Sequence, residues 1–242
     1  MNNIKRIISL MLIIVMVICM FGCTSSKTDN SEEESVSETG TWMINDQNIK
    51  VTLPDHVEKA FNKATEGFKG IMLEPLAYVG SQVVAGMNYM ILCRATTATQ
   101  KPVTTYRMAV IYADLEGNAE ITSLKDFDLS NYTEGKGLSG QEMLPGGWYV
   151  PEETSESDIP KEVKDAYEKA TATISWKRDK VNILAYLGSQ TVAGMNYSVL
   201  CKGEITGDDA ADNIIIITIY EDLDGNAEIS NIHILDLTEF AA

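Results

Sequence analysis

The chain has few of the residues that enzymes and metal sites use most. It contains two histidines and four cysteines among 242 residues. The histidines, His56 and His233, do not occupy equivalent positions in the chain's internal repeat, and neither has a repeated nucleophile or acid beside it. Catalytic triads, zinc sites and phosphate-binding loops therefore lack their residues. We expect a protein that is not an enzyme and that uses no metal and no cofactor.

Positive charge is also scarce. Nineteen lysines and arginines stand against 35 aspartates and glutamates, which gives a net charge of −16. A nucleic acid would be repelled by most of such a surface, so we expect no nucleic-acid partner. The hydrophobic fraction of 45% and the charged fraction of 22% are those of an ordinary globular protein and suffice for a packed core.

The cysteines do not indicate a disulfide framework. Cys93 and Cys201 are the two that lie outside the N-terminal leader, and they are separated by the same number of residues as Gln82 and Gln190. They therefore occupy the same position in two copies of a repeat. We interpret each as a small buried side chain on a strand, and we consider a redox or metal role the less favoured alternative.

The N-terminus has the pattern of an export signal. Two basic residues precede an apolar run, residues 7–20, which is short for a membrane span of about 20 residues. Gly22 and Cys23 follow directly. Residues 1–22 resemble a bacterial lipoprotein signal peptide, although the two residues before Gly22 depart from the usual pattern. Secretory cleavage without a lipid and an uncleaved anchor helix are the alternatives.

The lipoprotein resemblance implies a lipid on Cys23. The protein would then be exported and held at the extracellular face of the cell membrane. Residues 23–39 are polar and acidic, with too little apolar surface to offset the entropy of ordering the chain. We expect this segment to be a disordered tether.

A run of fourteen residues occurs twice. Leu76–Tyr89 and Leu184–Tyr197 differ at only two positions. Each run has the pattern of a strand, a tight bend and a second strand, with Gly86 or Gly194 at the bend. A bend needs a glycine because glycine tolerates a positive φ. Folding offers no such reason for the glutamine at position 82 or 190.

The repeat extends on both sides of these runs. Apolar residues at helical spacing predict helices over residues 53–64 and 159–170, and in the first copy the stripe that includes Val57 and Phe61 is expected to continue to Phe68. Strands are predicted over residues 87–95, 103–113 and 120–129, and over 195–203, 213–221 and 228–237. The fold class is therefore α+β, with one helix packed across an antiparallel sheet in each copy. We expect domains at residues 40–129 and 146–242, joined by a linker at 130–145.

The turns at Asp114–Ala119 and Asp222–Ala227 separate the last two strands of each copy. The spacing of Asp222, Asp224 and Asn226 is that of the first ligands of a calcium loop. The twelfth position of that loop holds histidine or lysine in place of the bidentate glutamate, so a hairpin turn is the favoured interpretation.

The bends Gln82–Gly86 and Gln190–Gly194 resemble the Gln-X-Val-X-Gly signature of the cystatins, which inhibit papain-like cysteine proteases. The order of elements in each copy, a short strand, a helix and four strands, is also that of the cystatins. The resemblance implies that each copy presents a wedge made of an N-terminal glycine, the signature bend and a second hairpin. The protease-binding residues that it implies are Gly40, Gln82, Val83, Val84, Ala85, Gly86, Gly146, Gln190, Thr191, Val192, Ala193 and Gly194.

The second hairpin departs from the family pattern. Acidic and glycine residues stand at Leu115–Ala119 and Leu223–Ala227, where many cystatins carry an aromatic anchor. We expect a reversible inhibitor of papain-like cysteine proteases anchored at the cell surface. The alternative is a non-inhibitory protein-binding module of the cell envelope that uses the same fold, since a fold does not determine an activity. Packing of the bend could also explain why both copies retain it.

Overall fold

The computed structural model describes residues 42–44, 52–133, 148–149, 159–172, 181–203 and 213–241, with the backbone alone at 42–44 and 148–149. These residues belong to one compact unit, residues 37–242. The predicted leader, the lipidation site Cys23, the tether, Gly40 and Gly146 lie outside the described residues. Neither helix in the described ranges is long and apolar enough to span a bilayer.

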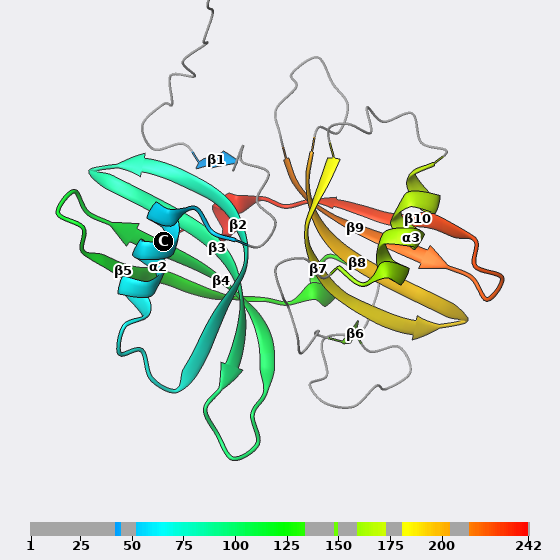
Figure 1. Ribbon diagram of the computed structural model, residues 1–242, viewed down its shortest axis with the longest axis horizontal. Coiled ribbons are helices and arrows are strands. Elements are labelled where there is room, and N and C mark those ends of the chain that lie inside the picture. Colours follow the sequence, from blue (N-terminus) through cyan, green and yellow to red (C-terminus); the bar gives the residue numbers. More distant parts are fainter. Residues whose placement is uncertain are drawn as a thin grey trace, which may run out of the picture. The chain divides into compact units, whose positions relative to one another are not determined.

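The two repeats form two antiparallel sheets (Figure 1), each with four long strands and one short strand. The first sheet has the strand order β1-β2-β3-β4-β5 and the second the order β10-β9-β8-β7-β6. The strands of the first sheet are β1 (Trp42–Ile44), β2 (Ile71–Val84), β3 (Gly86–Thr97), β4 (Thr104–Ala113) and β5 (Ala119–Phe127). Those of the second are β6 (Trp148–Tyr149), β7 (Val181–Val192), β8 (Gly194–Gly203), β9 (Asn213–Glu221) and β10 (Ala227–Ile234). With one helix in each repeat, α2 (Asp55–Thr65) and α3 (Lys161–Thr171), the α+β class is confirmed.

Each helix buries its apolar stripe. Val57, Ala60 and Phe61 of α2 share one cluster of buried side chains with residues of β2, β3 and β4. Val163 and Ala166 of α3 lie in the corresponding cluster of the second repeat. The charged residues between them remain in solvent, as expected of an amphipathic helix.

The prediction that Phe68 continues the helical stripe is wrong. The helix α2 ends at Thr65, and Gly67 adopts a φ of +77°, which turns the chain away from the helix axis. As a result Phe68 is 43% exposed. The predicted last strands are also too long, because short 3-10 helices begin at Leu129 and Leu237.

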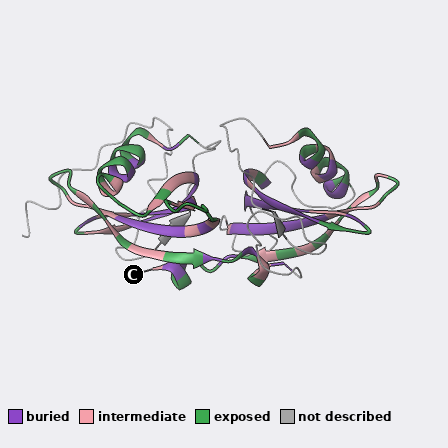
Figure 2. Cartoon of the chain, turned by 90° about the horizontal axis from the view of Figure 1, so that it is seen from below, coloured by how far each residue is buried: buried purple, intermediate pink, exposed green. Residues whose placement is uncertain are grey.

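The second face of each sheet is also buried. A third cluster contains side chains of both repeats, among them Leu76, Val79 and Met90 of the first and Leu187 and Leu200 of the second. Burial on both faces explains why residues 76–81 of β2 are all buried, and why residues 184–190 of β7 are buried except for the half-buried Tyr186 (Figure 2). The hydroxyl of Tyr106 donates to the carbonyl of Leu187 across this contact, at 2.6 Å.

The end of each repeat contacts the last strand of the other. Ser123 donates to the carbonyl of Phe240 at 3.1 Å, and Lys125 donates to that of Ala241 at 2.8 Å. In the reciprocal contact Asn231 donates to the carbonyl of Tyr132 at 2.9 Å. Tyr132 belongs to the start of the predicted linker, so the first residues of that segment are part of the folded structure. The sequence had left open whether the repeats touch, and these contacts show that they do.

Candidate functional site

One end of each sheet brings together three segments that are distant in the sequence. In the first sheet Trp42 of β1 pairs with Gln82, and Met87 pairs with Ala113, so the β2–β3 bend lies beside the β4–β5 turn (Figure 1). We call residues 82–86 and 114–118 the first tip. The second sheet has the same arrangement, and we call its residues 190–194 and 222–226 the second tip.

The glutamines have a role in the fold that the sequence analysis missed. Gln82 pairs with Asn88 across the bend, and its Oε1 accepts a hydrogen bond from Asn88 Nδ2 at 2.7 Å. Gln190 makes the same contact with Asn196, also at 2.7 Å. Gln190 is only 7% exposed. Each glutamine therefore has a structural contact that joins the two strands of its bend, which the sequence did not indicate.

The glycines are required by a close backbone approach. Gly86 has a φ of +136°, and a Cβ at this position would lie 2.3 Å from the carbonyl oxygen of Ala113. Gly194 has a φ of +126°, and its Cβ would lie 2.2 Å from the carbonyl oxygen of Glu221. Any other residue would separate these strands. A large substitution at either glycine would therefore disturb the sheet as well as the tip.

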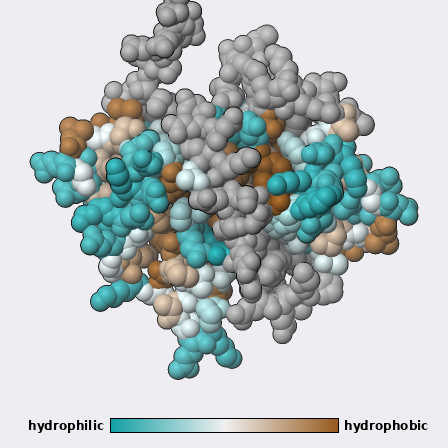
Figure 3. Space-filling model, in the orientation of Figure 1, coloured by the Kyte–Doolittle hydropathy of each residue, from teal (hydrophilic) through white to brown (hydrophobic). Residues whose placement is uncertain are grey.

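The residues at the apex of each bend reach solvent. Ala85 and Ala193 are exposed, and Val192 is 42% exposed. In Figure 3 hydrophobic residues lie at the surface beside hydrophilic ones at the end of the first sheet formed by the β2–β3 bend. Within the described residues, the apices of both bends are thus exposed.

A tyrosine supports each bend from the neighbouring strand. Tyr112 Oη donates to the carbonyl oxygen of Ala85 at 2.6 Å, and Tyr220 Oη donates to that of Ala193 at 2.6 Å. The bend is consequently held at its apex as well as along its strands. The apex carbonyl is also occupied before any partner arrives.

The β4–β5 turn is held by its first aspartate. Asp114 Oδ1 accepts from the backbone amides of Glu116 and Asn118, and its Oδ2 accepts from Asn118 Nδ2, all at 2.8 Å. The side-chain bond from Asn118, followed by the backbone bonds, lowers the pKa of Asp114. Asp222 has the same bonds and a lowered pKa for the same reason. The hairpin interpretation is confirmed, and no group of metal-binding side chains occurs among the described residues.

Each of these turns carries an exposed leucine. Leu115 is 90% exposed and Leu223 is 87% exposed. These two exposed leucines were not singled out from the sequence, where an aromatic anchor was the feature expected in this turn. The available signal was an apolar residue repeated within an otherwise polar turn.

The two thiols are buried side chains of the strands, as predicted. Cys93 on β3 and Cys201 on β8 are fully buried and unpaired. Burial raises the pKa of both thiols. A thiol that is inaccessible and protonated is a poor nucleophile.

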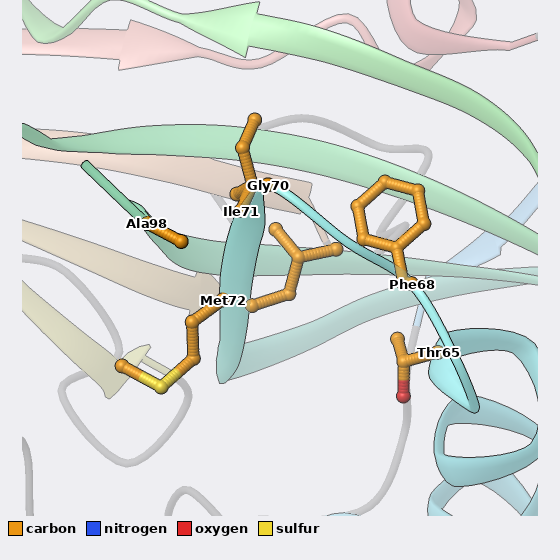
Figure 4. Close-up of a pocket in the computed structure, with 7 residues that line it drawn as sticks. Thr65, Phe68, Gly70, Ile71, Met72 and Ala98 are labelled. Carbon is orange, nitrogen blue, oxygen red and sulfur yellow. The ribbon is translucent and has the colours of Figure 1, made fainter.

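A shallow pocket of about 350 Å³ lies at the opposite end of the first sheet (Figure 4). Its lining is Thr65, Phe68, Gly70, Ile71, Met72, Leu73 and Ala98. These residues supply one hydroxyl and no ionisable side chain, so the pocket has no acid or base for catalysis. The tips remain the better candidate site.

The two tips repeat the same set of contacts. The glutamine–asparagine pair, the tyrosine beneath the apex and the aspartate in the second turn all occur twice. The joins between β3 and β4 and between β8 and β9 differ in sequence between the copies. Comparison of the whole chain with models of known protein families and with curated proteins finds no match to either.

Proposed function

We propose that this protein is a reversible inhibitor of papain-like cysteine proteases. It would carry two cystatin-like domains, residues 40–129 and 146–242, and a lipid on Cys23 would hold it at the extracellular face of the cell membrane. The observation that supports this most directly is the meeting of three segments at one sheet end. They are the N-terminal strand, the Gln-X-Val-X-Gly bend and the second turn, which are the parts of the wedge that the resemblance to the cystatins implies.

The geometry of the bend suits a plug better than a substrate. A protease must bring its nucleophile to a peptide carbonyl and place the carbonyl oxygen among the donors of its oxyanion hole. The carbonyl of Ala85 already accepts from Tyr112, and that of Ala193 accepts from Tyr220. The bend would therefore occupy a cleft without presenting this bond for attack.

The rigidity of both segments favours binding. A loop that is ordered before association loses less conformational entropy when it binds. The bend is held by its tyrosine, and the second turn by its aspartate, so less ordering is left than in a loop without these bonds. Apolar contact would come from Val84, Val192, Leu115 and Leu223. The family's aromatic anchor is missing, and since aromatic hot spots contribute about 2 kcal/mol or more, we expect weaker inhibition than by cystatins that have it.

The test is a titration of active papain with the chain from residue 39 onward. We expect reversible inhibition that is lost on dilution. Ala85→Glu combined with Ala193→Glu should abolish it, because these exposed apices would carry charge into the cleft. Ala98→Glu is the matched control, since Ala98 is exposed at the other end of the first sheet. Absence of inhibition at tens of micromolar protein would contradict the proposal.

The second candidate is a non-inhibitory protein-binding module of the cell envelope. It is favoured by the structural roles of Gln82 and Gly86, which explain the retained signature without any protease. Under this alternative the chain should neither inhibit active papain nor bind papain whose nucleophile has been carboxymethylated. Binding to the blocked enzyme, competed by active papain, would exclude the alternative.

A further inference from the structure

The second tip is tied to its helix by a lysine. Lys169 lies in the last turn of α3, and its Nζ donates to the carbonyl of Gly225 at 2.8 Å and to Glu221 Oε1 at 3.1 Å. Tyr197 Oη contacts the other carboxylate oxygen of Glu221 at 3.5 Å. Helix, sheet and turn thus meet at the ammonium group of Lys169.

The first repeat has a lysine at the equivalent position, but this lysine pairs with a residue of its own helix end and not with the turn. Lys63 occupies the equivalent position of α2, in the same Lys-Ala-Thr sequence. It pairs with Glu66 at 2.9 Å, and both side chains are largely exposed. The position equivalent to Glu221 holds Ala113, which has no carboxylate to receive a lysine. Two positions therefore account for the difference: Ala113 replaces the carboxylate of Glu221, and Glu66, where the second repeat has Ala172, gives Lys63 another partner.

Apart from the lysine contact, the two turns have the same hydrogen bonds. Asp114 and Asp222 make the same three hydrogen bonds within their turns. The lysine contact is thus the principal difference in how the turns are held. The bends differ as well, since Val83 and Val84 are partly buried whereas Thr191 and Val192 are exposed. In the second tip, more of the bend is exposed, and the turn is held by Lys169 as well as by its own aspartate.

From this asymmetry we propose that the second tip is the stronger binding site of the two, and that Lys169 is a positioning residue that sets its affinity. The inference rests on the proposed function, because it ranks two sites for the same partner. An exposed ion pair contributes little to folding. Its effect on binding is separate, since it limits the positions of the exposed Leu223 before association and so reduces the entropy lost on binding.

The first experiment measures order and needs no protease. Backbone amide order parameters from NMR relaxation are compared for the matched glycines, Gly117 and Gly225, in the chain from residue 39 onward. We expect a higher order parameter at Gly225. Lys169→Met, which keeps most of the apolar stem, should lower it to the value of Gly117, and the matched control Lys63→Met should change neither. Equal values in the unsubstituted chain would overturn the inference.

The second experiment measures binding. In a chain whose first tip is blocked by Ala85→Glu, Lys169→Met should weaken inhibition of papain about three- to tenfold, the range for ordering one further side chain on binding. Lys63→Met should leave it unchanged. In a chain blocked by Ala193→Glu, the pair Ala113→Glu and Glu66→Ala should strengthen the first tip by a similar factor.

The outcomes separate the two proposals. If no chain inhibits papain, the proposed function fails, and with it the ranking of the sites, while the NMR comparison still reports whether Lys169 orders the turn. If inhibition is present and Lys169→Met alters neither the order at Gly225 nor the affinity, Lys169 is not a positioning residue and the proposed function stands.

Discussion

Truncation of the exposed leucines tests whether the second turns enter a cleft. Leu115 and Leu223 are 90% and 87% exposed, so they add almost nothing to the core of the free protein. Their replacement by alanine should change the free energy of unfolding by less than about 0.5 kcal/mol. Any loss of inhibition can then be assigned to the contact itself.

The expected magnitude follows from the apolar surface that binding would cover. Leucine to alanine removes three side-chain carbons, each contributing about 0.8 kcal/mol when buried, so full burial gives roughly 2 kcal/mol. A difference of about 1.4 kcal/mol is tenfold in affinity. The double variant Leu115→Ala and Leu223→Ala should therefore raise the inhibition constant for papain about thirtyfold if both tips bind.

The assay is the residual activity of papain at increasing inhibitor concentration. Met72→Ala is the control, because Met72 is 55% exposed and lies at the other end of the first sheet. It should leave the inhibition constant unchanged. If the double variant inhibits as well as the unsubstituted chain does, the second turns do not contact the protease. The proposed contact surface would then consist of the bends alone.

Two further predictions concern stability and are read from urea denaturation of the chain from residue 39 onward. Gly86→Ala should destabilise the chain by about 3 kcal/mol or more, because the new Cβ would lie 2.3 Å from the carbonyl oxygen of Ala113. Gly67→Ala is the control and should have a smaller effect, since Gly67 also has a positive φ but a Cβ there meets nothing within 4 Å. Similar losses of stability in both variants would show that the close approach is not what requires Gly86. Tyr106→Phe should lower stability by about 1–3 kcal/mol, because it leaves the buried Leu187 carbonyl without its donor, and an unchanged midpoint would argue against this contact between the repeats.

Local patterns were sufficient for the elements. The spacing of Val57, Ala60 and Phe61 predicts the helix, because a helical stripe is set by residues three and four apart. The same pattern failed at Phe68, since a glycine ended the helix first. The bends were predictable because a tight bend between two apolar strands needs glycine within a few residues.

The candidate site was predicted only in part. The sequence located both signature bends and the second turns by their resemblance to the cystatins. It did not find the bond from Asn88 to Gln82, the tyrosines under the apices or the exposed leucines. Strand register decides these contacts, and a register cannot be read from one strand alone.

The sequence by itself determined the repeat, the class of fold and the positions of the bends, because periodicity and turn chemistry act over a few residues. Only the tertiary structure decided that the sheets are buried on both faces, and that Lys169 reaches a turn 56 residues further along the chain while Lys63 does not. Such contacts depend on which side chains the register and the packing bring together, so the exchange of Ala113 for Glu221 and of Glu66 for Ala172 gives equivalent lysines different partners.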